Sequence, residues 1–138
     1  MALMLPDRPF IALGVIAGIE GIALIGYAAF EAFEGIRIGA TGPSAVSSGP
    51  ALLLQILILA AFGAALVLVG SGWLRVRRWA RAPFVLAQLI ALVIGFPLIS
   101  AVGGVERGAG LALVVLAVIG IVLVFTPAVT RSLTESSD

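Results

Sequence analysis

The stretch Trp73-Leu74-Arg75-Val76-Arg77-Arg78-Trp79-Ala80-Arg81 decides the fold of this chain, because it places a cluster of arginines between two long apolar runs. We call residues 73–81 the basic hairpin. It holds four of the eight basic residues. Such a cluster between apolar runs is typical of a loop that joins two membrane-spanning helices.

The composition excludes a soluble domain and most catalytic chemistry. The chain is 62% hydrophobic and only 11% charged, whereas soluble domains carry roughly 25% charged residues. Its 138 residues leave no room for a soluble catalytic domain beside four membrane spans. Because it has no Cys and no His, thiolate and imidazole metal sites, haem ligation by His and a His base are excluded. We therefore predict no enzyme activity, no cofactor and no metal.

The apolar runs predict a single all-α membrane domain, residues 1–138, with four transmembrane helices in an up-down bundle. A helix needs about 20 apolar residues to cross the bilayer core. We expect the polar tail 131–138 to be disordered. The first run is too long for the apolar part of a signal peptide, so we expect it to remain as an uncleaved helix. The predicted spans are about 9–33, 50–72, 82–102 and 109–130.

The arginines predict the orientation. The chain has no Lys, and its Ala- and Gly-rich usage suggests a high-GC bacterium, hence an inner (plasma) membrane. Arginine gathers on the cytoplasmic side of such membranes. With the N-terminus inside, six arginines lie on the inner side and two on the outer side, which favours cytoplasmic N- and C-termini. The inner six are Arg8, Arg75, Arg77, Arg78, Arg81 and Arg131, and the outer two are Arg37 and Arg107.

Glu20 is the candidate for chemistry inside the membrane. It follows Pro9 by eleven residues, hence lies roughly 16 Å into the membrane at about 1.5 Å per residue. An ionised carboxylate near the midplane costs several kcal/mol, so the sequence predicts a neutral Glu20 unless water or a cation reaches it. Glu20, Tyr27, Glu31 and Glu34 follow one another at helical spacing, which predicts a polar stripe toward the outer surface.

Two interpretations of Glu20 stay open. In the first, it binds a proton or cation, with Tyr27, Glu31 and Gln88 as candidate members of the same site. In the second, it is a neutral acid that joins helices by a hydrogen bond to Gln88 or to a backbone carbonyl. For Tyr27 and Glu31 the ordinary placement of Tyr and acids near a membrane surface is an alternative.

Three glycines predict close helix packing. Gly14 and Gly18 form a GxxxG pattern, and Gly21 is expected on the same side of the helix. The openings Arg8-Pro9-Phe10 and Ala82-Pro83-Phe84 resemble each other, so we also consider a parallel duplication of a two-helix unit.

The four arginines of the basic hairpin admit three interpretations: topology alone, attraction to anionic headgroups of the bilayer, and docking of an acidic cytosolic partner. The first, in which the arginines only fix the orientation of the chain in the membrane, is sufficient to explain them. Headgroup attraction contributes about 1 kcal/mol per Arg near the surface. The cluster is too short and too close to the bilayer for nucleic-acid binding. It comprises Arg75, Arg77, Arg78 and Arg81.

The layout resembles that of uncharacterised small four-helix integral membrane proteins of actinobacteria. The resemblance rests on residues 75–86, an Arg/Trp-rich turn followed by Ala-Pro and a Gln-bearing helix, and on Phe125-Thr126-Pro127-Ala128 followed by Arg131. It implies four helices and no particular activity.

A second resemblance is local. Ala17-Gly18-Ile19-Glu20 and Phe33-Glu34-Gly35 are similar to the first helix of small multidrug resistance transporters. That resemblance implies a proton- and cation-binding role for Glu20 alone. The later helices lack the expected aromatic cage, the chain is longer, and the Arg bias disfavours a dual-topology dimer.

Taken together, the residues favour a non-enzymatic membrane component that works as a structural or accessory subunit, with a membrane protein partner or as a homo-oligomer. The alternative is a proton-coupled transporter of small molecules or cations that uses Glu20.

Overall fold

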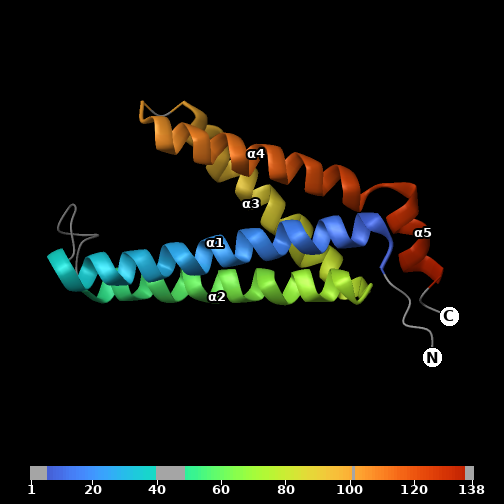
Figure 1. Ribbon diagram of the computed structural model, residues 1–138, viewed down its shortest axis with the longest axis horizontal. Coiled ribbons are helices and arrows are strands. Elements are labelled where there is room, and N and C mark those ends of the chain that lie inside the picture. Colours follow the sequence, from blue (N-terminus) through green and yellow to red (C-terminus); the bar gives the residue numbers. More distant parts are fainter. Residues whose placement is uncertain (1–5, 40–48, 101, 136–138) are drawn as a thin grey trace. The chain divides into compact units, whose positions relative to one another are not determined.

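The computed structural model describes residues 6–39, 49–100 and 102–135, and the regular elements in these ranges are all helices (Figure 1). Four segments are long and apolar enough to cross a membrane, with η1 and α3 counted as one. The structure thus confirms the all-α fold with four potential spans. The elements are α1 (Arg8–Ile38), α2 (Gly49–Leu74), the 3₁₀-helix η1 (Arg78–Ala80), α3 (Arg81–Ile99), α4 (Gly104–Val124) and α5 (Pro127–Glu135).

The first helix is longer than predicted, because it continues past residue 33 to Ile38. Gly39 then ends it with a φ of 75°, and the Gly39 N–H donates to the Gly35 carbonyl at 3.1 Å. Glycine adopts this left-handed conformation without a steric penalty, which makes it a common helix terminator. Residues 40–48 of the predicted loop lie outside the described residues.

The fourth span required a correction. The helix begins at Gly104 and ends at Val124, rather than covering 109–130. Pro127 then opens α5 at a position where the missing N–H costs nothing. Residues 131–135 are therefore helical, contrary to the prediction of a disordered tail. Val129 and Leu133 explain this, because they lie one turn apart and are both buried.

The basic hairpin turns through a Schellman motif that ends α2. The Arg77 N–H donates to the Gly72 carbonyl at 2.8 Å, and the Val76 N–H donates to the Trp73 carbonyl at 3.0 Å. Val76 occupies the left-handed position with a φ of 54°, which is strained for a β-branched residue. Its side chain packs against the buried apolar cluster around Trp73, and this contact offsets the strain.

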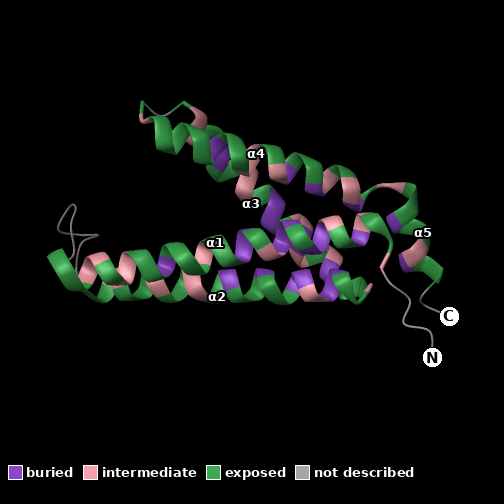
Figure 2. Ribbon diagram, viewed as in Figure 1, coloured by how far each residue is buried: buried purple, intermediate pink, exposed green. Residues whose placement is uncertain are grey.

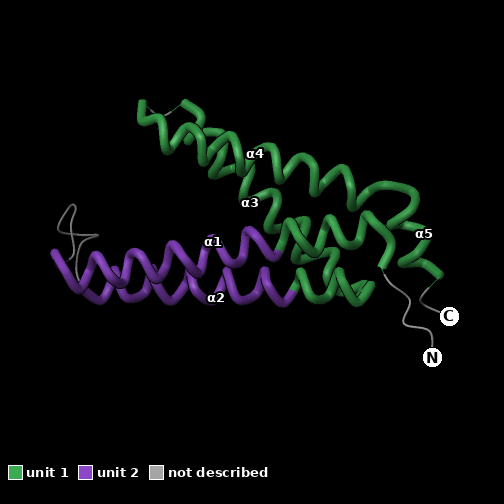
Figure 3. Tube along the Cα trace, in the orientation of Figure 1, with its two compact units in different colours: residues 1–17, 69–138 green, residues 18–68 purple. Residues whose placement is uncertain are grey.

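The chain divides into two compact units, residues 1–17 with 69–138 (unit 1) and residues 18–68 (unit 2) (Figure 3). The largest buried cluster lies in unit 1 and is built around Trp73, which is fully buried (Figure 2). The Phe10 ring lies 6.0 Å from the Trp73 ring between centroids, and the Phe84 ring lies 5.7 Å away in an edge-on arrangement. Trp73 thus joins the starts of α1 and α3.

Unit 2 contains the part of α1 from Gly18 onward and the part of α2 up to Leu68, and the two helices approach each other closely at two glycines. A Cβ placed on Gly21 would lie 2.6 Å from the Gly63 carbonyl oxygen, and one on Gly63 would lie 2.7 Å from the Gly21 carbonyl oxygen. Val67 and Ile25 complete the contact on either side. No side chain larger than hydrogen fits at either glycine without a shift of backbone.

Within unit 1, α3 and α4 make the same kind of contact. A Cβ on Gly110 would lie 2.8 Å from the Gly95 carbonyl oxygen, and one on Gly95 would lie 3.2 Å from the Gly110 carbonyl oxygen. Val114 and Ile99 flank this contact as Val67 and Ile25 flank the other.

The sequence spacing of the two contacts is the same. Gly21 follows Phe10 by eleven residues, and Gly95 follows Phe84 by eleven. Gly63-Ala64-Ala65-Leu66-Val67 and Gly110-Leu111-Ala112-Leu113-Val114 share four of five residues. The α1/α2 and α3/α4 helix pairs therefore repeat one packing motif, which supports the duplication suggested by their Pro-Phe openings.

Candidate functional site

Glu20 is buried inside the protein, with 8% of its surface exposed. It precedes Gly21 directly, so it lies on α1 beside the close approach to Gly63. A carboxyl group that points toward lipid would be exposed in this structure, because no membrane covers it. Glu20 is therefore enclosed by protein, as expected for a polar group at this depth.

The polar stripe beyond Glu20 is engaged in contacts along α1. Tyr27 is half exposed, and its hydroxyl interacts with the carboxylate of Glu31 one turn further on. The Glu34 carboxylate pairs with the Arg37 guanidinium at 3.7 Å, an ordinary pairing of residues three apart on a helix. These residues share a face as predicted, and their contacts are local to the helix.

Gln88 is fully buried between α3 and α4. Gly120 of α4 lies beside it: a Cβ placed on Gly120 would meet the Gln88 amide carbon at 3.5 Å, an ordinary contact, and would crowd the Phe84 ring at 2.9 Å. Gln88 belongs to unit 1 and Glu20 to unit 2, so the hydrogen bond between them stays a prediction. The position of Gln88 fits an amide that holds two helices together.

The predicted glycine contacts are correct for two of the three residues. Gly14 lies against the Gly70 backbone and the Leu74 side chain, and Gly21 lies against Gly63. A Cβ placed on Gly18 would meet nothing within 4 Å, so its predicted packing role stays a prediction. The two glycines that contact α2 are therefore seven residues apart in α1, rather than the four of the GxxxG pattern.

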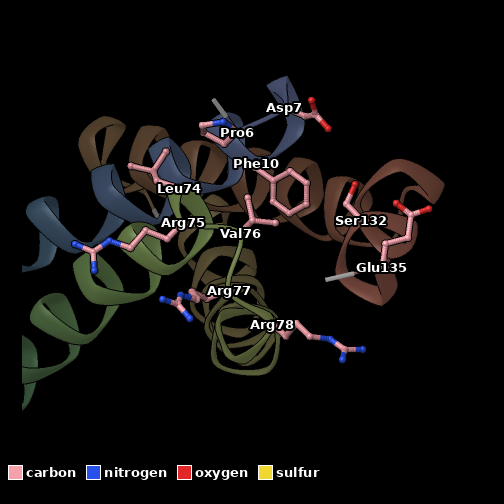
Figure 4. Close-up of a pocket in the computed structure, with 10 residues that line it drawn as sticks. All are labelled: Pro6, Asp7, Phe10, Leu74, Arg75, Val76, Arg77, Arg78, Ser132 and Glu135. Atoms are coloured by element: carbon pink, nitrogen blue, oxygen red, sulfur yellow. The ribbon is translucent and has the colours of Figure 1, made fainter. Parts of the chain in front are cut away.

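The basic hairpin borders an open recess of about 900 Å³ in unit 1 (Figure 4). Its lining combines apolar side chains with three arginines and with two carboxylates that come from other parts of unit 1. The lining residues are Pro6, Asp7, Phe10, Leu74, Arg75, Val76, Arg77, Arg78, Ser132 and Glu135. In Figure 4 the Arg78 side chain points away from those of Arg75 and Arg77, so the three guanidinium groups do not converge on one ligand.

The arginines of the basic hairpin face outward. Arg75, Arg77 and Arg78 are exposed, and none of them pairs with a carboxylate among the described residues. Arg81 lies over the Phe125 ring, with 5.2 Å between the guanidinium carbon and the ring centroid. The guanidinium groups of the basic hairpin are therefore dispersed rather than gathered around one position.

Comparisons of the chain with protein-family models, with curated proteins and with solved structures find no match. The described residues contain no group of three or more acidic, His or Cys side chains that could hold a metal ion.

The structural role of Trp73 was not predicted from the sequence. The residue belongs to the buried apolar cluster of unit 1 and contacts Phe10 and Phe84 there. Its indole N–H is buried without a hydrogen-bond partner among the described residues, which costs about 1–3 kcal/mol. The signal that could have located Trp73 is the shared Pro-Phe opening of the two repeats, since Phe10 and Phe84 both contact it.

Proposed function

We propose that this protein is a small, non-enzymatic component of a bacterial plasma membrane, which works as a homo-oligomer or as a structural subunit of a membrane complex. One observation carries the proposal: two polar side chains of the spans are buried where helices approach each other. Gln88 is buried beside Gly120, and Glu20 is buried beside the contact of Gly21 with Gly63. Polar groups in membrane helices hold helices together in this way.

The proposed orientation places both termini and the basic hairpin in the cytoplasm. The six-to-two division of arginines supports it. The exposed, outward-facing Arg75, Arg77 and Arg78 would then lie among anionic headgroups of the inner leaflet.

The experiment is extraction in mild detergent, followed by measurement of the protein mass in the particle and identification of any co-purified chain. A homo-oligomer gives a multiple of the mass of one chain, and an accessory subunit gives a defined complex with another membrane protein. A single chain without partner contradicts the proposal.

A second candidate function, proton-coupled transport of small molecules or cations, is favoured by the comparison of the two helix pairs. The position of Glu20, just before the glycine of the contact, is occupied by Ile94 in α3. The α3/α4 pair forms the equivalent glycine contact although an isoleucine stands at this position. The glycine contact itself therefore needs no carboxyl group, so the contact does not account for the presence of Glu20 in α1.

Proteoliposomes with a trapped pH-sensitive dye test this candidate. On addition of an organic cation such as ethidium, a proton-coupled exchanger moves protons across the membrane. The Glu20→Gln variant keeps hydrogen-bonding capacity and loses the ionisable group, so its proton movement should fall to the level of empty liposomes. Equal proton movement in the variant and the original protein ends this candidate, provided that both are inserted in equal amounts.

A further inference from the structure

The recess beside the basic hairpin brings charges of opposite sign to one side of unit 1. Arg78 is the first residue of η1, and Glu135 is the last residue of α5. Both side chains are exposed and line the recess. In Figure 4 they lie on the same side of the recess, to the right, whereas Arg75 and Arg77 point to the left. Arg78 and Glu135 are therefore an acid and a base that a ligand in the recess can meet together.

These two charged groups do not neutralise each other. Neither Arg78 nor Glu135 forms an ion pair within the described part of the chain. A ligand that carries an anionic and a cationic group can engage both residues, because each of its ends meets the opposite charge. A purely anionic ligand is repelled by Glu135. The pair of residues therefore favours a ligand with both charges.

The apolar part of the lining indicates what else the ligand carries. Phe10, Leu74 and Val76 line the recess beside the charged groups. Because α1 begins at Arg8 and α2 ends at Leu74, the recess lies where two apolar spans reach their polar ends. In a bilayer this is the depth of the headgroups and of the first acyl carbons. A phospholipid therefore has polar and apolar parts where this lining has them.

We propose that the recess binds a phospholipid whose headgroup carries a phosphate and a primary ammonium group, as in phosphatidylethanolamine. The phosphate accepts hydrogen bonds from the Arg78 guanidinium, and the ammonium donates to the Glu135 carboxylate. The recess, at about 900 Å³, is within the usual range for small-molecule sites, roughly 300–1,000 Å³. The lipid site goes beyond the function proposed above and is the same for a homo-oligomer and for a structural subunit.

Native mass spectrometry of the detergent-solubilised chain tests the choice of headgroup. The fraction of protein with bound lipid is measured for phosphatidylethanolamine, phosphatidylcholine and phosphatidylglycerol with identical acyl chains. The quaternary ammonium of phosphatidylcholine cannot donate a hydrogen bond, and phosphatidylglycerol has no cationic group. We expect phosphatidylethanolamine to bind about two- to fivefold more tightly than either, as one exposed ion pair allows. Binding of phosphatidylethanolamine that is no tighter than that of either other lipid overturns the proposal.

Two matched pairs of variants locate the site. Glu135→Gln should abolish the preference for phosphatidylethanolamine, whereas Glu106→Gln should keep it, because Glu106 is an equally charged, exposed residue at the start of α4. Arg78→Gln should weaken phosphatidylethanolamine binding about two- to fivefold, and more than Arg75→Gln, whose side chain points away. All four residues are exposed, so the changes leave the buried cluster intact.

The comparison within each pair decides whether the lipid occupies this recess. A preference that survives Glu135→Gln, or that Glu106→Gln abolishes as well, overturns the assignment. So does equal weakening by Arg78→Gln and Arg75→Gln. The protein mass in detergent decides the proposed homo-oligomer separately, because a single-chain mass with the expected lipid preference rejects the homo-oligomer and leaves the lipid site standing.

Discussion

Substitution of alanine for the contact glycines tests the repeated packing motif. In Gly63→Ala the new Cβ would lie 2.7 Å from the Gly21 carbonyl oxygen, and in Gly110→Ala it would lie 2.8 Å from the Gly95 carbonyl oxygen. Ordinary carbon contacts lie at about 3.5–4.0 Å. Because the opposing atoms belong to backbone, the helices of each pair must separate by several tenths of an ångström.

Overpacking of this kind costs about 1–3 kcal/mol of unfolding free energy, which is a factor of roughly 5 to 150 in the unfolding equilibrium. Since the two contacts are equivalent, we expect both variants to lose stability within this range. Gly18→Ala is the control, because a Cβ at Gly18 meets nothing within 4 Å. Alanine gains up to about 1 kcal/mol over glycine in a helix, so this variant should be unchanged or slightly more stable.

The assay is unfolding by SDS in mixed micelles, followed by circular dichroism in the helix region. The Gly63→Ala and Gly110→Ala curves should shift to lower SDS fractions, and the Gly18→Ala curve should not. Curves for the two contact variants that coincide with that of the original protein would refute the packing argument. So would a loss at Gly18 as large as at the contacts.

Three other predictions concern unit 1. Trp73→Ala should lower the unfolding free energy by about 3–5 kcal/mol, because it empties the centre of the buried cluster, whereas the same change at the half-exposed Trp79 should cost clearly less in the same SDS titration. Leu133→Asp places a charge at a site that is 3% exposed and should detach α5, which limited proteolysis would detect as faster cleavage near the C-terminus. The third change replaces the four arginines of the basic hairpin by Gln, namely Arg75, Arg77, Arg78 and Arg81. It leaves two arginines on each side of the membrane, so we expect a mixture of the two orientations in protease-protection experiments. A uniform orientation would show that these arginines do not control the orientation.

The sequence was sufficient to predict the helical class and the four spans, because apolar length is a strong signal in a chain with so few charges. The residues at which the helices end were predicted less accurately. α1 continues past the apolar run until Gly39 supplies a left-handed terminator, and α4 stops at Val124, just before Pro127 opens the next helix. The amphipathic α5 was missed because Val129 and Leu133 are only two apolar positions in a short polar segment.

Packing partners could not be deduced from composition. In a chain with 17 glycines, GxxxG patterns arise easily, and the pattern selected Gly18, which faces open space. The two repeated contacts, Gly21 with Gly63 and Gly95 with Gly110, join glycines on successive helices, so they do not show up as a local pattern within one helix. Gly21 and Gly95 lie at the same distance in sequence from Phe10 and Phe84. This shared spacing indicates a repeat only once both contacts are known from the structure.

The central claim is that this protein acts as an assembled membrane component, and its mass in a native lipid environment tests that claim most directly. The chain would be extracted with its surrounding lipid by an amphipathic copolymer, and the protein mass of the particles would be measured by light scattering. The account predicts two or more chains in each particle, or one chain in a fixed ratio with a partner protein. A homogeneous population of particles that each contain one chain and no other protein would contradict it.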